Sequence, residues 1–485
     1  MLARAITHAL VGLEPRRVEV EADVYENTLP SFVIVGLPDR ACAEARQRVR
    51  SGIDAAELRF PRGRVIVNLA PAGLRKEGSG YDLPIALAVL AASRQLPHAE
   101  LDRHAAVGEL ALDGRLRRVG GVLAVAEGAR RMGIERLLCP TDSAAEASLA
   151  GIVALPFRHL ADAVAYLRGE QEPDEIEPVR IAQPASLPDL ADVRGHERAR
   201  RVLEIAAAGG HNLLLGGPPG TGKTMLARRL PGILPPLDAE ASLEVTRIHS
   251  VAGLLSHEQP LLDTPPFRAP HHSASTAAVV GGGPGIRPGE ASLAHRGVLL
   301  LDELAEFPRP TLEALRQPLE DGFVCIARAA GRAIFPARFQ LVATMNLCPC
   351  GARGDPGAEC SCSAQRLAAY RDKLSRALLD RFDLVIAVPR PRSVELAAGP
   401  GEASEPVAER VASARELLAV APLRRTAETD ELLTRAVDTL PLSGRGRARV
   451  ARVARTIAAL AGAEEVRPDH LGEALAYRAP RELAA

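Results

Sequence analysis

The residues with the clearest chemical purpose form the stretch GPPGTGKT. Its spacing fits G-x-x-x-x-G-K-[ST], in which glycines let successive backbone N–H groups turn toward phosphate oxygens. We expect Lys223 to reach the β and γ phosphates of a nucleoside triphosphate and Thr224 to ligate Mg²⁺. The predicted phosphate-binding residues are Gly217, Pro218, Pro219, Gly220, Thr221, Gly222, Lys223 and Thr224. The motif therefore predicts the use of ATP and Mg²⁺.

Two later apolar runs end in polar side chains that suit the same chemistry. GVLLLDE ends in two carboxylates. We expect Asp302 to hold the Mg²⁺ shell and Glu303 to polarise an attacking water. FQLVATMN ends in Asn346, which is placed to orient that water or to sense the γ-phosphate. An asparagine that only caps a turn is the alternative for Asn346.

One arginine is a candidate for transition-state stabilisation. LLDRFDL places Arg381 between two acids. A structural ion pair is the ordinary interpretation, but phosphoryl-transfer enzymes also use such an arginine in trans to neutralise charge.

Positioning these groups requires a strand before each of them. HNLLL precedes the glycine loop as a strand would, and MLARRL after the loop can begin a helix. Lys223 is one of only three lysines in the chain, which argues against a chance glycine-rich loop. The sequence thus predicts an α/β fold around this site.

Composition limits the classes of function. The chain has 485 residues, enough for two or three domains, and acidic and basic residues balance at 60 each, so any polyanion site must be local. Aromatics are 3% with no Trp, which weakens models built on stacked bases. We found neither a signal-peptide pattern nor an apolar stretch of bilayer length, and we expect a cytoplasmic protein without a membrane partner.

Breaks in composition predict the domains. Residues 1–168 alternate β-rich and Ala-rich runs, and the acidic, proline-rich stretch 169–188 is predicted to be a linker. We expect the ATPase core at 189–395 and a helical C-terminal domain at 396–485.

Together, the motifs resemble one family. GGPPGTGKT, PGEASLAHRGVLLLDELAEF, MNLCPCG and LLDRFDL are similar to the magnesium-chelatase-like AAA+ ATPases, specifically the ComM/YifB group of competence-associated proteins. The resemblance covers almost the whole chain and implies a ring, expected to be a hexamer, in which Arg381 completes the neighbour's site.

The C-terminal domain resembles the AAA+ lid in its stretch SGRGRARVARVARTIAAL. The resemblance maps the sensor-2 arginine of the lid onto Arg445. Arg449, Arg452 and Arg455 follow at helical spacing, and we expect these three to form a solvated face.

The first domain resembles Lon-type peptidase domains, a ribosomal S5 domain 2-like fold. The similarity lies in RKEGSGYDLPIALAVL and in residues 107–140. Alignment places Gly80 where those enzymes have the nucleophile, with Ser79 one residue early, and Leu123 where they have the lysine base. Because a serine needs a base, we predict a non-proteolytic domain. An unusual dyad of Ser79 with Lys76 is the alternative.

Four of the seven cysteines cluster in one loop. Cys348, Cys350, Cys360 and Cys362 offer four thiolates, a set that suits tetrahedral zinc in a structural role. A redox-active pair or unligated thiols are the alternatives. The family pattern N-P-C-P-C-G is altered here because Leu347 replaces the first proline.

Candidate DNA contacts lie in the glycine-rich segment 267–297, where this group inserts loops that face the pore of the ring. Arginines and histidines there can contact a phosphate backbone without reading sequence, although bracing of subunit contacts is the alternative. A second candidate is the hairpin-like stretch 325–339. The candidates are Arg268, His271, His272, Arg287 and Arg328.

The resemblance implies a DNA-translocating helicase that moves branch points while incoming DNA is integrated during natural transformation. A chelatase-type remodeller of a partner protein is the first alternative, but we expect the ATPase subunit of that family to lack the first domain present here. An ATP-dependent protease is a weaker one, and a nucleotide-dependent scaffold is a third.

Overall fold

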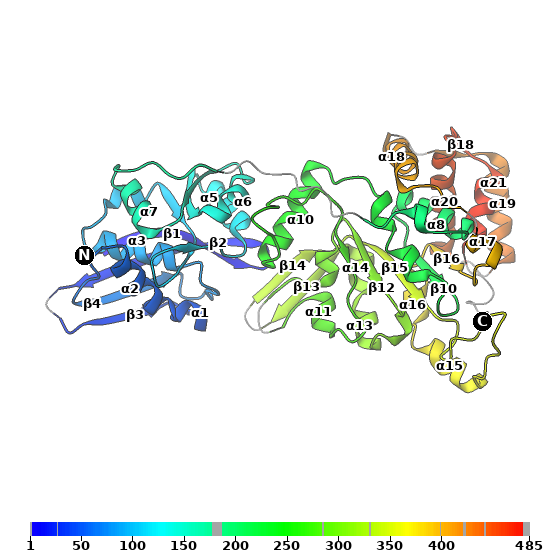
Figure 1. Ribbon diagram of the computed structural model, residues 1–485, viewed down its shortest axis with the longest axis horizontal. Helices are drawn as coiled ribbons and strands as arrows, with labels where there is room; N and C mark the ends of the chain where they lie inside the picture. The colour runs from blue at the N-terminus through cyan, green and yellow to red at the C-terminus, as the bar shows by residue number, and fades with distance from the viewer. Residues whose placement is uncertain are drawn as a thin grey trace.

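The computed structural model describes residues 2–26, 28–176, 187–283, 286–328, 331–397, 399–420, 423–440 and 443–478. Half of the predicted linker and short parts of both candidate DNA segments therefore lie outside the described residues. Figure 1 shows an elongated molecule, with the first domain at one end, the nucleotide core in the middle and the C-terminal helices at the other end.

The first domain is built on a mixed seven-stranded sheet. Its β1–β2 hairpin pairs antiparallel from Leu2 opposite Asp23 to Val11 opposite Glu14. Alternate residues of β2 are buried, because side chains of a strand alternate between its two faces. In order across the sheet, the strands are β3 (Ser31–Val35), β4 (Arg64–Ala70), β2 (Glu14–Tyr25), β1 (Leu2–Val11), β5 (His104–Ala106), β8 (Arg136–Pro140) and β9 (Val153–Phe157).

Helices surround this sheet, and the central one, α3, is buried along its whole length. A short hairpin, β6 (Glu109–Leu110) with β7 (Leu116–Arg117), lies beside it. The helices are α1 (Arg40–Ala43), α2 (Ala45–Ala55), α3 (Asp82–Ala92), α4 (His98–Leu101), α5 (Val122–Arg131), α6 (Thr141–Ser148) and α7 (Leu160–Leu167).

The second domain contains a five-stranded, fully parallel sheet, as the AAA+ resemblance implies. Its strands are short runs of Leu, Val and Ile; every residue of β10 and β12 is buried, as expected of a parallel sheet covered on both faces. In order, the strands are β11 (Phe267–Arg268), β12 (Val298–Leu301), β15 (Gln340–Met345), β10 (Leu213–Gly216) and β16 (Leu384–Ala387).

Helices and one hairpin complete the core, and the α/β class predicted for it is confirmed. The hairpin consists of β13 (Phe323–Arg328) and β14 (Gly331–Pro336). The helices are α8 (Glu197–Gly209), α9 (Lys223–Ala227), α10 (Ala239–Val251), α11 (Thr276–Val280), α12 (Glu290–Leu293), α13 (Arg309–Ala314), α14 (Arg316–Asp321), α15 (Ala364–Asp372) and α16 (Arg376–Leu379).

The C-terminal part is mostly helical, as predicted, and its longest helices share one apolar cluster with α8 of the core. Ser443 caps α20 by accepting a hydrogen bond from the Gly446 amide. Its elements are α17 (Ser393–Ala397), α18 (Ser404–Val420), β17 (Arg424–Arg425), α19 (Ala427–Thr439), α20 (Gly444–Leu460), β18 (Glu465–Val466) and α21 (Pro468–Ala476).

The first domain docks on the core through α10, which packs against α5 (Figure 1). Glu146 is buried at this junction and accepts hydrogen bonds from the Leu123 amide at 3.0 Å and from the Ser250 hydroxyl at 2.5 Å. Arg247 of α10 donates to Glu127 of α5 at 3.1 Å. These polar contacts join the two domains directly.

Within the described part of the chain, no helix combines the length and apolar character needed to cross a bilayer.

Candidate functional site

Three parallel strands end side by side and bring the predicted phosphate site together. The register pairs Gly216 of β10 with Met345 of β15, and Ala343 of β15 with Leu301 of β12. The loop after β10, Asp302 and Asn346 therefore all leave the carboxyl edge of the sheet, where open α/β sheets bind ligands.

The glycine loop leads into α9 with Lys223 as its first residue. Gly220 and Gly222 adopt φ of +74° and +83°, which only glycine takes without strain, so the turn that directs backbone amides inward depends on them. Thr221 is buried, and its hydroxyl donates to the Pro218 carbonyl at 3.0 Å. The loop is thus held in shape by its own residues.

Lys223 is folded back over this loop. Its ammonium donates to the carbonyls of Gly217 at 2.9 Å and Pro218 at 2.6 Å, and to the Asn346 Oδ1 at 3.3 Å. Burial lowers the pKa of Lys223, and the carboxylates of Asp302 and Glu303 oppose that shift. A triphosphate would supply the negative charge that this buried ammonium otherwise gets from carbonyl dipoles.

Asp302 and Thr224 are placed to hold a divalent cation. The Thr224 hydroxyl donates to Asp302 Oδ1 at 2.8 Å, and the Thr344 hydroxyl donates to the same oxygen at 2.6 Å. A hydroxyl and a carboxylate beside a phosphate loop are the hard oxygen donors that Mg²⁺ prefers. The donor set therefore fits the predicted magnesium ion.

Glu303 adopts a left-handed backbone conformation, with φ of +57°. Its amide donates to the Thr344 hydroxyl at 3.0 Å, and its carboxylate, about half exposed, lies 3.7 Å from the His272 Nδ1. Strained non-glycine residues of this kind concentrate at functional sites. The structure thereby brings a candidate catalytic carboxylate next to a candidate DNA contact.

A cavity of about 900 Å³ adjoins the glycine loop. The residues that line it include Gly217, Pro218, His196, Leu347 and Gly354. Its position beside the phosphate loop suits the nucleoside end of a triphosphate.

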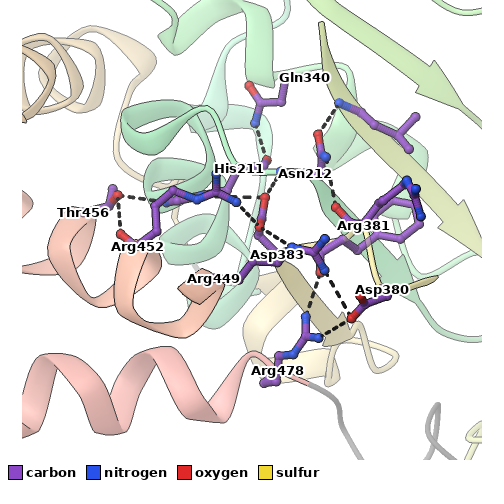
Figure 2. Close-up of polar contacts among 12 residues, drawn as sticks. His211, Asn212, Gln340, Asp380, Arg381, Asp383, Arg449, Arg452, Thr456 and Arg478 are labelled. Atoms are coloured by element: carbon purple, nitrogen blue, oxygen red, sulfur yellow. Dashed lines mark hydrogen bonds and ion pairs between the residues drawn. The ribbon is translucent and has the colours of Figure 1, made fainter. Parts of the chain in front are cut away.

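Arg381 lies at the opposite, amino edge of the same sheet. It comes just before β16, and the amides of Asp383 and Leu384 donate to the Asn212 carbonyl at the start of β10. The Asn212 side chain donates to the Arg381 carbonyl at 3.0 Å (Figure 2). A side chain at this edge is separated from Lys223 by the length of the strands.

The Arg381 guanidinium is buried and lies between the Ala377 carbonyl and the half-exposed carboxylate of Glu320. Its Nε has no hydrogen-bond partner among the described residues. Arg445 donates to the same Glu320 oxygen at 3.1 Å. The structure thus brings Arg381 and Arg445 together, and places both away from their own phosphate loop.

The two acids that flank Arg381 bind arginines of the C-terminal part instead (Figure 2). Asp383 is buried and accepts hydrogen bonds from the Asn212 amide at 3.0 Å and from Arg452 at 2.8 Å. Arg449 lies between Asp380 and Asp383, at 3.3 and 3.5 Å. Our expectation of a solvated arginine face was wrong for Arg449, whose side chain is only 14% exposed. Arg452 is exposed as expected, although it also donates to Asp383. Both residues join the C-terminal helix α20 to the core.

His211, just before the amino-terminal end of β10, completes this network. Its Nε2 lies 2.8 Å from the Thr456 hydroxyl of α20, and its Nδ1 lies 3.9 Å from Asp383 (Figure 2). Burial lowers the pKa of His211 to about 4. The imidazole is therefore neutral at ordinary pH and links the core to the C-terminal helix α20 through its hydrogen bond with Thr456.

The amino edge opens onto a cavity of about 1260 Å³. Arginines dominate its lining, with Arg381, Arg445, Arg449, Arg452 and Arg455 among them. A concave surface with this charge suits a polyanion or an acidic surface of another subunit.

The candidate DNA contacts lie in different settings. Arg268 forms a two-pronged ion pair with Glu290, at 2.6 and 2.8 Å, and this pairing ties it to α12. His271 is exposed and its ring stacks 4.1 Å from that of His272, and Arg287 is exposed. The side chain of Arg328 lies outside the described residues, although its hairpin packs against the β1–β2 turn of the first domain.

The four cysteines gather as predicted. Their sulfurs all lie within 4.8 Å of one another, and all seven cysteines of the chain are free thiols. A hydrogen bond from the Ala352 backbone, followed by bonds from Cys348 and Cys362, lowers the pKa of Cys350 to about 6.

Ser79 has no lysine base. Lys76 is fully buried and donates to the carbonyls of Gly36 and Pro71, so it is committed to the backbone. Ser79 donates to Glu109, and Leu123 is buried. The alternative dyad of Ser79 with Lys76 is not formed.

Our sequence reasoning missed two site residues. Thr344 has a signal, since it lies two positions before Asn346 on a strand, and alternate side chains share a face. Glu320 has none, because a single acid at the end of the short helix α14 looks like any surface carboxylate.

Comparison with known proteins covers the same three parts of the chain. Residues 189–396 match the family model described as "Magnesium chelatase, subunit ChlI", residues 20–143 match "Subunit ChlI of Mg-chelatase", and residues 401–478 match its C-terminal model. Among similar proteins, the competence protein ComM of Haemophilus influenzae is 43% identical, with 99% of this chain and 97% of that protein covered. The YifB protein of Escherichia coli is 42% identical (98% and 96% covered), and an uncharacterized protein of Mycobacterium tuberculosis is 46% identical (98% of each).

Proposed function

The chain belongs to the magnesium-chelatase-like AAA+ ATPases of the ComM/YifB group, and we propose that it is an ATP-driven ring motor that acts on DNA. We propose a hexamer as the working ring. The function we favour is branch migration, which would promote integration of incoming DNA during natural transformation.

In our proposed ATP site, each side chain at the carboxyl edge of the sheet has a separate role. Lys223 leaves its carbonyl partners to bind the β and γ phosphates, and Asn346 orients the attacking water while Glu303 accepts a proton from it. Mg²⁺, held by Thr224 and Asp302, would neutralise developing charge on the phosphate oxygens. The base and ribose would occupy the cavity beside Pro218.

The single observation that carries the ring is the separation of the site into two halves. Lys223 lies at the carboxyl edge, whereas Arg381 and Arg445 lie together at the amino edge. A short strand of four residues still spans about 13 Å, more than an arginine side chain can bridge. We therefore infer that both arginines act on the nucleotide of a neighbour, where its phosphates would replace Glu320.

DNA as the substrate is supported by the name of the Haemophilus influenzae relative, a competence protein, and by the exposed His271 and Arg287. His272, on the same segment, lies 3.7 Å from Glu303. Contact of this segment with DNA would therefore change the surroundings of the Glu303 carboxylate. Such a change could couple DNA binding to ATP hydrolysis.

A labelled four-way DNA junction tests this proposal. We expect movement of the branch point with ATP and the wild-type chain, and none with Glu303→Gln, which keeps the size of the side chain but loses its basicity. ATP turnover that ignores DNA, together with a stationary junction, would refute the helicase function.

A chelatase-type remodeller of a partner protein is the second candidate. Both the core and the first domain match models named for the chelatase subunit. The first domain therefore does not separate the two candidates, contrary to our expectation that chelatase subunits lack it. We propose that this domain is a non-proteolytic assembly module, because Ser79 lacks a lysine base.

A further inference from the structure

We propose that Cys348, Cys350, Cys360 and Cys362 bind one zinc ion, and that this site braces the phosphate loop and Asn346. The second half of the inference rests on the proposed ATPase function, whereas the first half does not. The zinc would act structurally, since four protein ligands leave no open coordination position.

The spacing of the sulfurs suits zinc. Cys348 Sγ lies 3.3 Å from Cys350 Sγ, which lies 3.7 Å from Cys360 Sγ. Tetrahedral zinc with bonds of about 2.3 Å holds its sulfurs about 3.8 Å apart, whereas a disulfide needs about 2 Å. The four thiols are thus gathered at the scale of a metal site and not paired as disulfides.

The loop around the cysteines is shaped like a metal-binding turn. Gly351 has φ of +82°, and its amide donates to the Cys348 carbonyl at 3.1 Å. The Arg353 amide donates to Cys348 Sγ at 3.2 Å. Amide donors to sulfur stabilise a thiolate that ligates a metal.

The segment from Leu347 to Ser363 contains no helix or strand, an unusual length for an irregular loop. Cys348 is buried, but Cys350 is exposed and Cys360 and Cys362 are partly exposed, so little apolar burial fixes the outer half. A metal that joins both ends of the segment would supply the missing constraint.

This segment contacts the ATP site directly. A Cβ at Gly351 would lie 3.1 Å from the ring of Pro219, so the turn packs closely on the phosphate loop. Leu347, Arg353 and Gly354 line the cavity beside that loop. The segment is thus one wall of the proposed nucleotide pocket.

Both ends of the segment also converge on Asn346. The segment begins immediately after this residue, whose side chain accepts from Lys223 at 3.3 Å. It ends at α15, from which the Tyr370 hydroxyl donates to the Asn346 carbonyl at 3.2 Å. Loss of the metal would therefore loosen the support of both the phosphate loop and Asn346.

Elemental analysis of the full chain, purified with a reductant and without added metal, tests the site. We expect about one zinc per chain in the wild type, almost none in Cys350→Ser/Cys360→Ser, and an unchanged content in the matched control Cys325→Ser. A wild-type protein without zinc, or with iron in its place, would overturn the assignment. So would zinc retained by the double variant.

Nucleotide binding tests the bracing role. Stripping the wild type with a zinc-selective chelator should weaken binding of a fluorescent ATP analogue roughly 10-fold, and added zinc should restore it. Unchanged affinity after stripping overturns the bracing role and leaves the zinc site. A protein that contains zinc but does not hydrolyse ATP refutes the proposed function alone. If the double variant does not fold, the chelator experiment on the wild type still shows whether zinc supports nucleotide binding.

Discussion

Mixing two inactive chains should restore ATP hydrolysis if the two halves of the site belong to different subunits. Arg381→Ala removes the neighbour-facing half and Lys223→Ala removes the phosphate-binding half. Each change alone should lower turnover about 1000-fold or more, which corresponds to at least about 4 kcal/mol of transition-state stabilisation. Each variant therefore keeps the half of the site that the other variant lacks.

The size of the restored activity follows from the arrangement. An interface works when its phosphate loop comes from an Arg381→Ala chain and its arginine from a Lys223→Ala chain. In an equal, randomly assorted mixture each condition holds for half of the subunits. About one quarter of the interfaces should therefore be active, whatever the size of the ring.

The assay is steady-state phosphate release after the two chains have been mixed and allowed to exchange. A matched control mixes Arg381→Ala with Arg445→Ala, since no subunit in that mixture carries a complete arginine pair and activity should stay low. Turnover no higher than the sum of the separate variants, or equal rescue by the control pair, would refute the trans arrangement.

Three further predictions address single residues. Glu303→Gln should bind ATP with nearly unchanged affinity but lower turnover by about 100-fold or more, which separate binding and turnover assays can distinguish. Asp383→Ala should cost about 3 kcal/mol of unfolding free energy in urea, because it deprives the largely buried Arg449 and the Asn212 amide of a buried acceptor. The pKa of His211 falls to about 4 on folding, so the unfolded chain binds more protons between pH 6.5 and 4. Stability should therefore fall by up to about 3 kcal/mol as pH drops through that window, and less steeply in His211→Gln.

The candidate phosphate site was predictable because a local sequence pattern marks each of its parts. A glycine loop fixes its own geometry, and apolar runs that end in polar side chains place Asp302 and Asn346 at one edge of a parallel sheet. The strand and the helix that we expected on either side of the glycine loop, β10 and α9, also appear. We did not single out the β1–β2 hairpin, although buried Val18, Val20 and Ala22 alternate along β2.

The amino edge was less predictable because long-range packing decides it. Nothing in the spacing of α20 indicates that Arg449 meets Asp380 and Asp383, which lie more than one element away in sequence. The position of Arg445 beside Glu320 was equally unpredictable, because it depends on how the C-terminal helix α20 packs on the core. Helical spacing identifies which residues share a face, but not what that face meets.

The carboxylate of Glu146 has a mechanical consequence. It is shared by the first domain, through Arg118 and the Leu123 amide, and by the Ser250 hydroxyl near the end of α10. A rotation of α10 would rotate the first domain with it. The displacement would be largest at the part of the seven-stranded sheet that lies farthest from α10. The distance between a pair of dyes, one on the far edge of that sheet and one on α19, would then report movements that are too small to detect next to the nucleotide.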